Sequence, residues 1–223
     1  MADSTCNIAV LISGGGSNLQ SIIDHIQAGH IHAKINCVIS NKAQAYGLQR
    51  AKAANIPTHI IEHVNFSSRE AFDAELLKII KVNNIDLIIL AGFMRILSKT
   101  FIDQCDANIV NIHPSLLPKF PGLHTHQRAI DANETEHGCS VHFVSDELDS
   151  GPLILQAKVK VNKTDTAETL ASRVLEKEHI IYPLVAKWYS EKRLQQKDEH
   201  VYFDNKRLDK AILLTTEHQA ELQ

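Results

Sequence analysis

Four short apolar runs in the first ninety residues are separated by three helix-like segments, and this alternation constrains the fold most strongly. Most of these runs are apolar on both faces, which predicts strands buried between two layers. Such strands with helices between them are typical of a parallel sheet. The sequence therefore predicts an α/β fold, a doubly wound, mostly parallel, Rossmann-like sheet with helices on both faces. The predicted strands are residues 7–12, 35–39, 57–61 and 86–90.

The three intervening segments have helical spacing of their apolar residues. In the first, Leu19, Ile22, Ile23 and Ile26 recur at intervals of three and four, as one face of a helix does. We expect a second helix over residues 45–54. The third, over residues 69–82, is amphipathic and places Phe72, Leu76, Ile79 and Ile80 on one face.

The pattern changes in the second half of the chain. Residues 140–144 and 156–161 alternate polar and apolar side chains, which predicts strands with one face in water. Asp165 and Glu168 match a helix capping box and predict the start of a long helix that runs toward Trp188. Residues beyond about 190 are charged and weakly patterned. We therefore expect one integrated domain over residues 1–190 and a peripheral C-terminal extension over residues 191–223.

Composition excludes several classes of function. A net charge of −3 argues against a dedicated nucleic-acid binder, which usually carries a basic excess. No apolar run reaches the roughly 18 residues of a membrane span, and the short acidic N-terminus is unlike a signal peptide. The four cysteines are scattered without a CxxC pair, as in a reduced cytoplasmic protein.

A glycine-rich loop follows the first predicted strand. Gly14, Gly15 and Gly16 let the backbone approach an anion, and the helix that follows supplies unpaired N–H groups. Ser17 and Asn18 add side-chain donors. A dinucleotide fingerprint requires a third glycine where Leu19 stands, and the Gly-Lys of a nucleotide P-loop is absent. The loop thus favours a site for one phosphate group, although a plain turn into a helix has the same pattern.

A second group of polar residues is typical of acyl chemistry. Asn111 and His113 alternate at the end of an apolar run, so both side chains can face one side of a strand. An amide and a protonated imidazole can both stabilise the oxyanion that forms when an amine attacks a formyl carbon. Asp149, from a later loop, can favour the charged form of His113 directly or through a water. The alternative is that both residues have structural roles, His113 as a histidine before Pro114 and Asp149 as a turn former.

Five histidines within thirty residues raise the question of a metal site. None of them has the spacing of a zinc motif, and no Cys or Asp stands at a regular ligand interval. We therefore expect no metal. The histidines are His113, His124, His126, His137 and His142, and the segment after His124 also resembles a helix start.

Together these motifs closely resemble the phosphoribosylglycinamide formyltransferase family, over nearly the whole chain up to about residue 190. The motifs are SGGGSNLQ at 13–20, AGFMRIL at 91–97, NIHPSLLP at 111–118, PGLHTH at 121–126 and DELDSGP at 146–152. Ser150 stands where glycine is common in the family. The resemblance implies transfer of the formyl group of 10-formyltetrahydrofolate to the amine of glycinamide ribonucleotide, a step of purine synthesis.

The resemblance also implies roles for particular residues. Gly16, Ser17 and Asn18 would hold the ribonucleotide phosphate, and Glu178 would contact its glycinamide end. Catalysis would fall to Asn111, His113 and Asp149. The folate would lie against Met94, Arg95, Ile96, Leu97 and Arg69, with a loop folded over its pterin. That loop comprises Ser145, Asp146, Glu147, Leu148 and Asp149.

Three other functions remain open from the sequence. Formyltetrahydrofolate hydrolase shares much of this pattern but has an added N-terminal domain. Methionyl-tRNA formyltransferase lacks the glycine-rich loop and carries an extra domain for tRNA. A nucleotide-binding sensor would keep the loop but need not keep the catalytic set. We expect a cytoplasmic enzyme of small-molecule substrates, monomeric or homodimeric, without nucleic acid or membrane partners.

Overall fold

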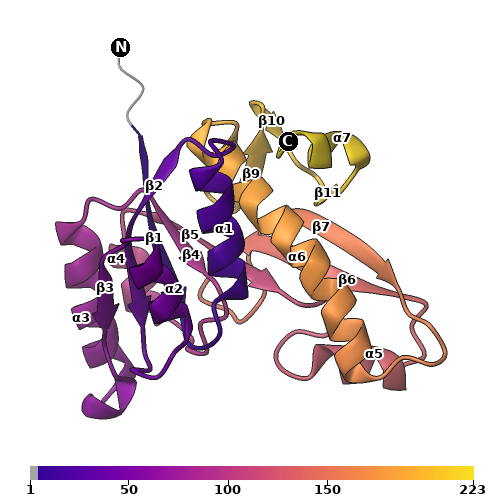
Figure 1. Cartoon of the computed structure of the whole chain (residues 1–223), viewed down its shortest axis with the longest axis horizontal. Helices are drawn as coiled ribbons and strands as arrows, with labels where there is room; N and C mark the ends of the chain where they lie inside the picture. The colour runs from indigo at the N-terminus through magenta and orange to yellow at the C-terminus, as the bar shows by residue number, and fades with distance from the viewer. Residues whose placement is uncertain (1–4) are drawn as a thin grey trace. The chain divides into compact units, whose positions relative to one another are not determined.

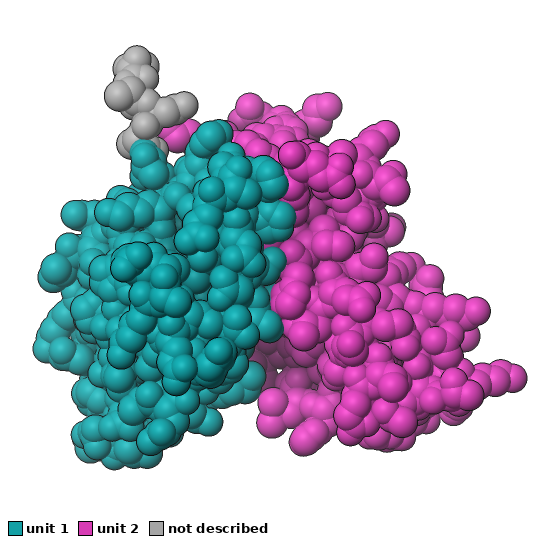
Figure 2. Space-filling model, viewed as in Figure 1, with its two compact units in different colours: residues 1–110 teal, residues 111–223 magenta. Residues whose placement is uncertain are grey.

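The computed structural model describes residues 5–223, in two compact units (Figures 1 and 2). Unit 1 ends at Val110 and unit 2 begins at Asn111, within strand β5 (Asn108–His113). The N-terminal residues 1–4, on which the exclusion of a signal peptide partly rests, lie outside the described residues. No helix of residues 5–223 is long and apolar enough to cross a membrane.

Unit 1 contains a parallel sheet in the order β4-β1-β2-β3. The four predicted strands are therefore confirmed, with small shifts of their ends. The predicted α/β class with a mostly parallel sheet is also confirmed. The strands are β1 (Cys6–Ile12), β2 (Ala33–Ser40), β3 (Thr58–Ile60) and β4 (Leu87–Leu90).

The helices of unit 1 follow from their apolar periodicity. Leu19, Ile22 and Ile23 are buried on the first helix, and the helix predicted at 69–82 has the predicted bounds. It begins where Ser68 accepts a hydrogen bond from the Ala71 N–H, a regular N-terminal cap. The helical elements are α1 (Ser17–Gln27), α2 (Gly47–Ala53), the short η1 (His63–Asn65), α3 (Arg69–Val82) and α4 (Lys99–Gln104).

The strands of unit 1 end together at one edge of their sheet. Ile12 pairs with Ser40, and Leu11 pairs with Leu90, so the segments that follow β1, β2 and β4 emerge side by side. The glycine-rich loop follows β1, and the segment that begins at Ala91 follows β4. Parallel α/β sheets bind their ligands at this carboxyl edge.

Unit 2 contains the end of β5, an antiparallel pair and a long helix. Strand β6 (Glu136–Phe143) pairs antiparallel with β7 (Leu153–Lys160), and α6 (Ala167–Ser190) packs on both (Figure 1). The predicted inward residues Leu170, Val174, Ile181 and Val185 are all buried. The segment after His124 is a helix, α5 (Thr125–Asp131).

Two sequence predictions in unit 2 were wrong in detail. Strand β6 has no wet face: only its first residue is exposed, because Ser140 and His142 find hydrogen-bond partners inside. The capping residue of α6 is Thr166, which exchanges hydrogen bonds with Thr169. Asp165 instead accepts from the Asn162 N–H at 2.7 Å and from Arg173 at 2.8 Å. The N-cap of the helix is therefore one residue later than the Asp165–Glu168 pattern predicts.

Residues 191–223 fold against the end of α6 within unit 2. They form an antiparallel sheet, the strand β11 (Ile212–Leu213), which pairs in parallel with β7, and the short helix α7 (Thr216–Ala220). Trp188 Nε1 donates to Glu221 Oε2 at 2.8 Å, and Leu194 and Leu222 are buried. The antiparallel sheet comprises β8 (Leu194–Lys197), β9 (His200–Phe203) and β10 (Lys206–Arg207).

Candidate active site

The glycine-rich loop lies between β1 and the N-terminus of α1, as its sequence predicts. Gly14 and Gly15 are exposed, and a side chain on either would meet open space. The first turn of α1 contains no acidic residue, so no carboxylate of that turn competes with an anion for its N–H groups. A helix N-terminus of this kind attracts anions.

Two glycines allow this loop to form, and sequence reasoning found only one of them. Gly16 has a left-handed backbone (φ 70°), and a Cβ there would lie 2.7 Å from the Cα of Gly47. Gly47 begins α2 and donates its N–H to the Gly14 carbonyl at 3.0 Å. Arg50, one turn further, donates from Nε to the Gly15 carbonyl at 2.9 Å. The loop is therefore shaped by α2, and a Gly-x-x-Arg pair at a helix start is too common a pattern to have indicated this.

Replacing Gly16 by alanine is expected to weaken ribonucleotide binding about tenfold, because an L-residue in the left-handed region costs about 1–2 kcal/mol and its Cβ meets Gly47. The affinity for a folate analogue alone should stay unchanged. Gly29→Ala is the matched control, since Gly29 also has a left-handed backbone (φ 80°) but lies at the other end of α1 in open space. Titration calorimetry measures both affinities; equal losses for both ligands would make the loop merely structural.

The segment after β4 exposes apolar side chains. Met94 is 62% and Ile96 is 47% exposed, whereas the alternate residues Phe93 and Leu97 are buried. Among the described residues, the backbones of Arg95, Ile96 and Leu97 take part in no backbone–backbone hydrogen bond. Exposed apolar side chains beside unpaired backbone polar groups are suited to a flat, polar heterocycle.

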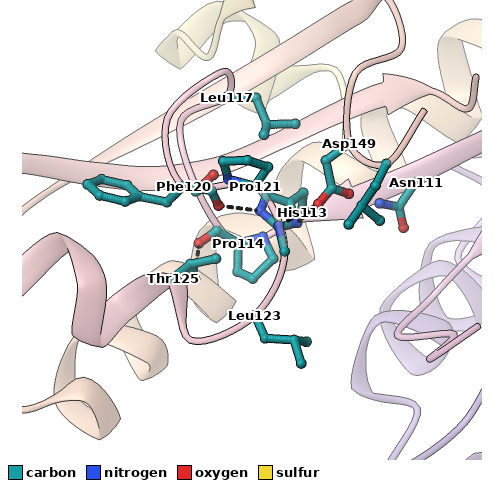
Figure 3. A network of polar contacts seen from close by, with 12 residues as sticks. Asn111, His113, Pro114, Leu117, Phe120, Pro121, Leu123, Thr125 and Asp149 are labelled. Atoms are coloured by element: carbon teal, nitrogen blue, oxygen red, sulfur yellow. Dashed lines mark hydrogen bonds and ion pairs between the residues drawn. The ribbon is translucent and has the colours of Figure 1, made fainter. Parts of the chain in front are cut away.

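His113 is buried between a backbone carbonyl and a carboxylate. Its Nε2 lies 2.9 Å from the Phe120 carbonyl oxygen, and its Nδ1 lies 3.4 Å from Asp149 Oδ2 (Figure 3). Both ring nitrogens therefore face an oxygen atom, one in a hydrogen bond and the other at ion-pair distance. Both side chains are only 7% exposed, which strengthens the attraction of the pair.

The Phe120 carbonyl is held in place by a strained loop. Phe120 adopts a left-handed backbone (φ 56°), which is uncommon for a bulky residue. The Arg128 guanidinium lies 5.4 Å from the centre of the Phe120 ring and donates to the Pro121 carbonyl at 2.6 Å. Thr125 donates to the Pro114 carbonyl at 2.7 Å (Figure 3). These contacts hold the loop in the conformation that aims its carbonyl at His113.

Asn111 is oriented by a residue that sequence reasoning did not assign to the site. Its Nδ2 lies 3.1 Å from His142 Nε2, and His142 Nδ1 lies 2.8 Å from the Phe143 carbonyl. The carbonyl requires a donor, so we assign the proton to Nδ1 and leave Nε2 to accept from Asn111. Burial lowers the pKa of His142 and outweighs the Phe143 hydrogen bond and Asp149, which raise it, and this agrees with a neutral ring. The second amide hydrogen of Asn111 remains for a ligand.

Replacing His142 by alanine is expected to lower kcat about tenfold, less than the loss of a whole aligned donor, because the Asn111 amide can then rotate. His142→Gln keeps an acceptor for Asn111 and should recover part of that loss. Steady-state kinetics on both variants test the orientation. If glutamine and alanine are equally slow, His142 does not act through Asn111.

Asp149 comes from the loop between β6 and β7. Its Oδ2 accepts from the Gly122 N–H at 2.8 Å, and its Oδ1 lies 3.9 Å from His142 Nε2. Position 151, at the end of this loop, accepts only glycine, because a Cβ there would lie 1.8 Å from the Phe143 carbonyl oxygen. The structure thus brings Asn111, His113 and Asp149 into one network within unit 2.

The remaining predicted residues lie at separate places. Arg69 is exposed at the first position of α3 in unit 1. Glu178 is buried on α6 in unit 2. Ser145 is half-buried, and Asp146, Glu147 and Leu148 are exposed in the β6–β7 loop.

The histidine cluster separates into distinct contacts. His126 Nδ1 lies 3.2 Å from His137 Nε2, and burial, together with His126, lowers the pKa of His137 to about 4. His124 is exposed and immediately precedes α5. Among residues 5–223, no three His, Cys, Asp or Glu side chains gather in an arrangement that could hold a metal ion.

Comparison with known proteins identifies the family. The sequence model of the formyl transferase family matches residues 6–186. The phosphoribosylglycinamide formyltransferase of Escherichia coli K12 is 51% identical over 202 residues, which are 91% of this chain and 95% of the relative. The human trifunctional purine biosynthetic protein adenosine-3 is 46% identical over 176 residues, 79% of this chain and 17% of the human protein.

Solved structures agree with these relatives. The phosphoribosylglycinamide formyltransferase from Coxiella burnetii has a TM-score of 0.89 and 51% identity, over 94% of this chain and 100% of that one. Glycinamide ribonucleotide transformylase 1 from Symbiobacterium toebii has a TM-score of 0.86 and 42% identity, over 89% and 94% of the two chains. The predicted fold and the predicted resemblance are both confirmed. The chain therefore belongs to the formyl transferase family and, within it, to the phosphoribosylglycinamide formyltransferases.

Proposed function

We propose that the enzyme transfers the formyl group of 10-formyltetrahydrofolate to the amino group of glycinamide ribonucleotide, giving formylglycinamide ribonucleotide in purine synthesis. The observation that carries this proposal is the His113 ring between Asp149 and the Phe120 carbonyl, beside an oriented Asn111 amide. This is a preorganised positive charge with a hydrogen-bond donor, which acyl transfer to an amine requires.

In the proposed mechanism, the glycinamide amine attacks the formyl carbon and a C–N bond forms. Negative charge develops on the formyl oxygen, where the free Asn111 amide hydrogen and the His113 imidazolium stabilise it. The bond to the folate nitrogen N10 then breaks, and the proton lost by the amine ends on N10. Asp149 keeps His113 charged and, through a water, accepts and returns that proton.

The ribonucleotide phosphate is proposed to bind at Gly16, Ser17 and Asn18. The N–H groups at the start of α1, the open space above Gly14 and the guanidinium of Arg50 beside the loop all support an anion there. Glu178 is the proposed partner of the positively charged or polar glycinamide end, because it is a buried carboxylate on α6.

The folate is proposed to lie on Met94, Arg95, Ile96 and Leu97. The exposed apolar side chains of Met94 and Ile96, beside the backbones of residues 95–97 that have no backbone hydrogen-bond partner among the described residues, support a pterin site there. Arg69 would pair with a carboxylate of the folate tail. The loop Ser145, Asp146, Glu147, Leu148 and Asp149 would cover the pterin, with Leu148 already 51% exposed.

The remaining parts of this proposal concern the setting of the enzyme. All four cysteines are free thiols, which supports a reducing compartment such as the cytoplasm. Residues 1–190 are proposed to be the catalytic domain, with residues 191–223 as a C-terminal extension. The substrates are small molecules, and no metal takes part in the proposed reaction.

The deciding experiment mixes the purified protein with 10-formyl-dideazafolate and glycinamide ribonucleotide, and follows deformylation by absorbance. We expect release of deformylated folate only when the ribonucleotide is present. Release without the ribonucleotide would assign a formyltetrahydrofolate hydrolase instead. Formylation of methionyl-tRNA would assign the tRNA enzyme, and folate binding without any release would assign a silent binder.

A further inference from the structure

A buried polar chain lies at the carboxyl edge of the unit 1 sheet, apart from the proposed catalytic residues. The Ser13 hydroxyl donates to Asn41 Oδ1 at 2.5 Å and accepts from the Met94 N–H at 2.8 Å. Ser13 is 6% exposed and Asn41 is 2% exposed. Neither residue has a role in the proposed mechanism, so their burial requires another reason.

The direction of this chain is fixed by its chemistry. A hydroxyl has one hydrogen, and Asn41 Oδ1 can only accept, so Ser13 donates to Asn41 and must accept from Met94. Bonds in such a series polarise and strengthen one another. His63 Nδ1 lies 3.3 Å from both the side-chain nitrogen and the backbone oxygen of Asn41, which restrains that amide in turn.

Ser13 joins the two proposed ligand sites of unit 1. It is the last residue before Gly14 and the phosphate loop, and Met94 is the first residue of the folate segment. A second bond, from the Ser13 N–H to the Gly92 carbonyl at 3.2 Å, holds the same two backbones together. The base of the loop and the Met94 N–H are therefore joined by a direct hydrogen bond.

The far end of the folate segment is also fixed. Asp73, which is buried on α3, accepts from the Ser98 N–H at 2.7 Å. A polar contact thus holds each end of residues 94–97: Ser13 binds the Met94 N–H, and Asp73 binds the N–H of the following Ser98. The orientation of the segment therefore depends on Ser13 at one end and on Asp73 at the other.

We propose that the Ser13 hydroxyl is a positioning group through which ribonucleotide in the phosphate loop tightens folate binding on residues 94–97. This inference rests on the ligand assignments of the proposed function and adds a coupling between them. A phosphate bound at Gly16, Ser17 and Asn18 would restrain the loop and, through the Ser13 hydroxyl, would further restrain the Met94 end of the segment. The second ligand then loses less conformational entropy on binding.

The coupling is measured as a ratio of two dissociation constants. The ligand is 5,10-dideazatetrahydrofolate, which has no formyl group to contact the amine, and it is titrated with and without saturating glycinamide ribonucleotide. In the native enzyme the ribonucleotide should tighten folate binding at least about fivefold, the lower end of typical couplings. In Ser13→Ala this ratio should fall to about one.

Three further variants separate positioning from stability. Ser13→Thr restores a hydroxyl and should recover the coupling. Asn41→Ala removes the side-chain oxygen that accepts from the Ser13 hydroxyl. It should lower the ratio of dissociation constants even if Ser13→Ala folds poorly. Ser40→Ala is the matched control, because Ser40 is fully buried at the paired position beside Ile12 but its hydroxyl donates only to the Lys42 carbonyl.

The coupling would be overturned if Ser13→Ala had the same ratio of folate dissociation constants as Ser40→Ala and the native enzyme. A ratio of one in the native enzyme would overturn it too. Those results leave formyl transfer by the native enzyme intact. Failure of the proposed function is distinct, since the native enzyme would then neither bind the ribonucleotide nor form product with it.

Discussion

His113→Ala is expected to lower kcat by a factor of about 10² to 10⁴, the range that a positioned acid–base group contributes. Both substrate affinities should change little, because the substitution removes a charge opposite the developing oxyanion rather than a contact to either ground-state ligand. Pre-steady-state kinetics with the formyl donor and the ribonucleotide measure the chemical step directly.

The control for His113→Ala is a histidine outside the network. His59 is half-buried on β3 in unit 1, and His59→Gln should keep native turnover. Circular dichroism and the folate dissociation constant show whether the His113 variant is folded and competent to bind. A folded His113→Ala enzyme with native kcat would remove this residue from the proposed mechanism.

Asp149→Asn is expected to lower kcat about a hundredfold near neutral pH, the lower end of what one aligned transition-state group contributes. The amide oxygen of asparagine can still accept from the Gly122 N–H, so the substitution removes the charge beside His113 but keeps the position of the side chain. The loss of the negative charge beside His113 is therefore the cause of the expected fall in kcat, and steady-state kinetics at neutral pH measure it.

The matched control for this charge removal is Asp131→Asn, which neutralises an exposed carboxylate of α5 in the same unit. Its kcat should equal that of the native enzyme. A native kcat in Asp149→Asn, with the loop still in place, would contradict the proposed pairing of Asp149 with His113.

The two predictions differ in what they test. His113→Ala asks whether the ring contributes to the chemical step, and Asp149→Asn asks whether the neighbouring negative charge does. If the first variant is slow and the second has native kcat, the charge of Asp149 is not needed for turnover. The Phe120 carbonyl, held by the Arg128 and Thr125 contacts, would then be the contact of His113 that matters.

Local sequence periodicity predicted much of the secondary structure. The apolar runs predicted β1, β2 and β4 of unit 1, because burial on both faces requires a mostly apolar sequence, whereas β3 is only half-buried. The 69–82 helix was predicted to the residue from its apolar spacing, and in the structure the Ser68 cap fixes its first turn. Where polar residues are buried, as in β6, or where neighbouring residues compete as a cap, as at Asp165 and Thr166, the local pattern was not sufficient.

The sequence by itself determined the α/β class, the glycine-rich turn before α1 and the alternation of Asn111 with His113, because each depends on neighbours in the chain. Only the tertiary structure decided which partners those groups meet. His142, 31 residues from Asn111, orients its amide, and Gly47 permits the turn at Gly16. Strand register and loop conformation set these contacts, and both are properties of the packed chain that no short stretch of sequence contains.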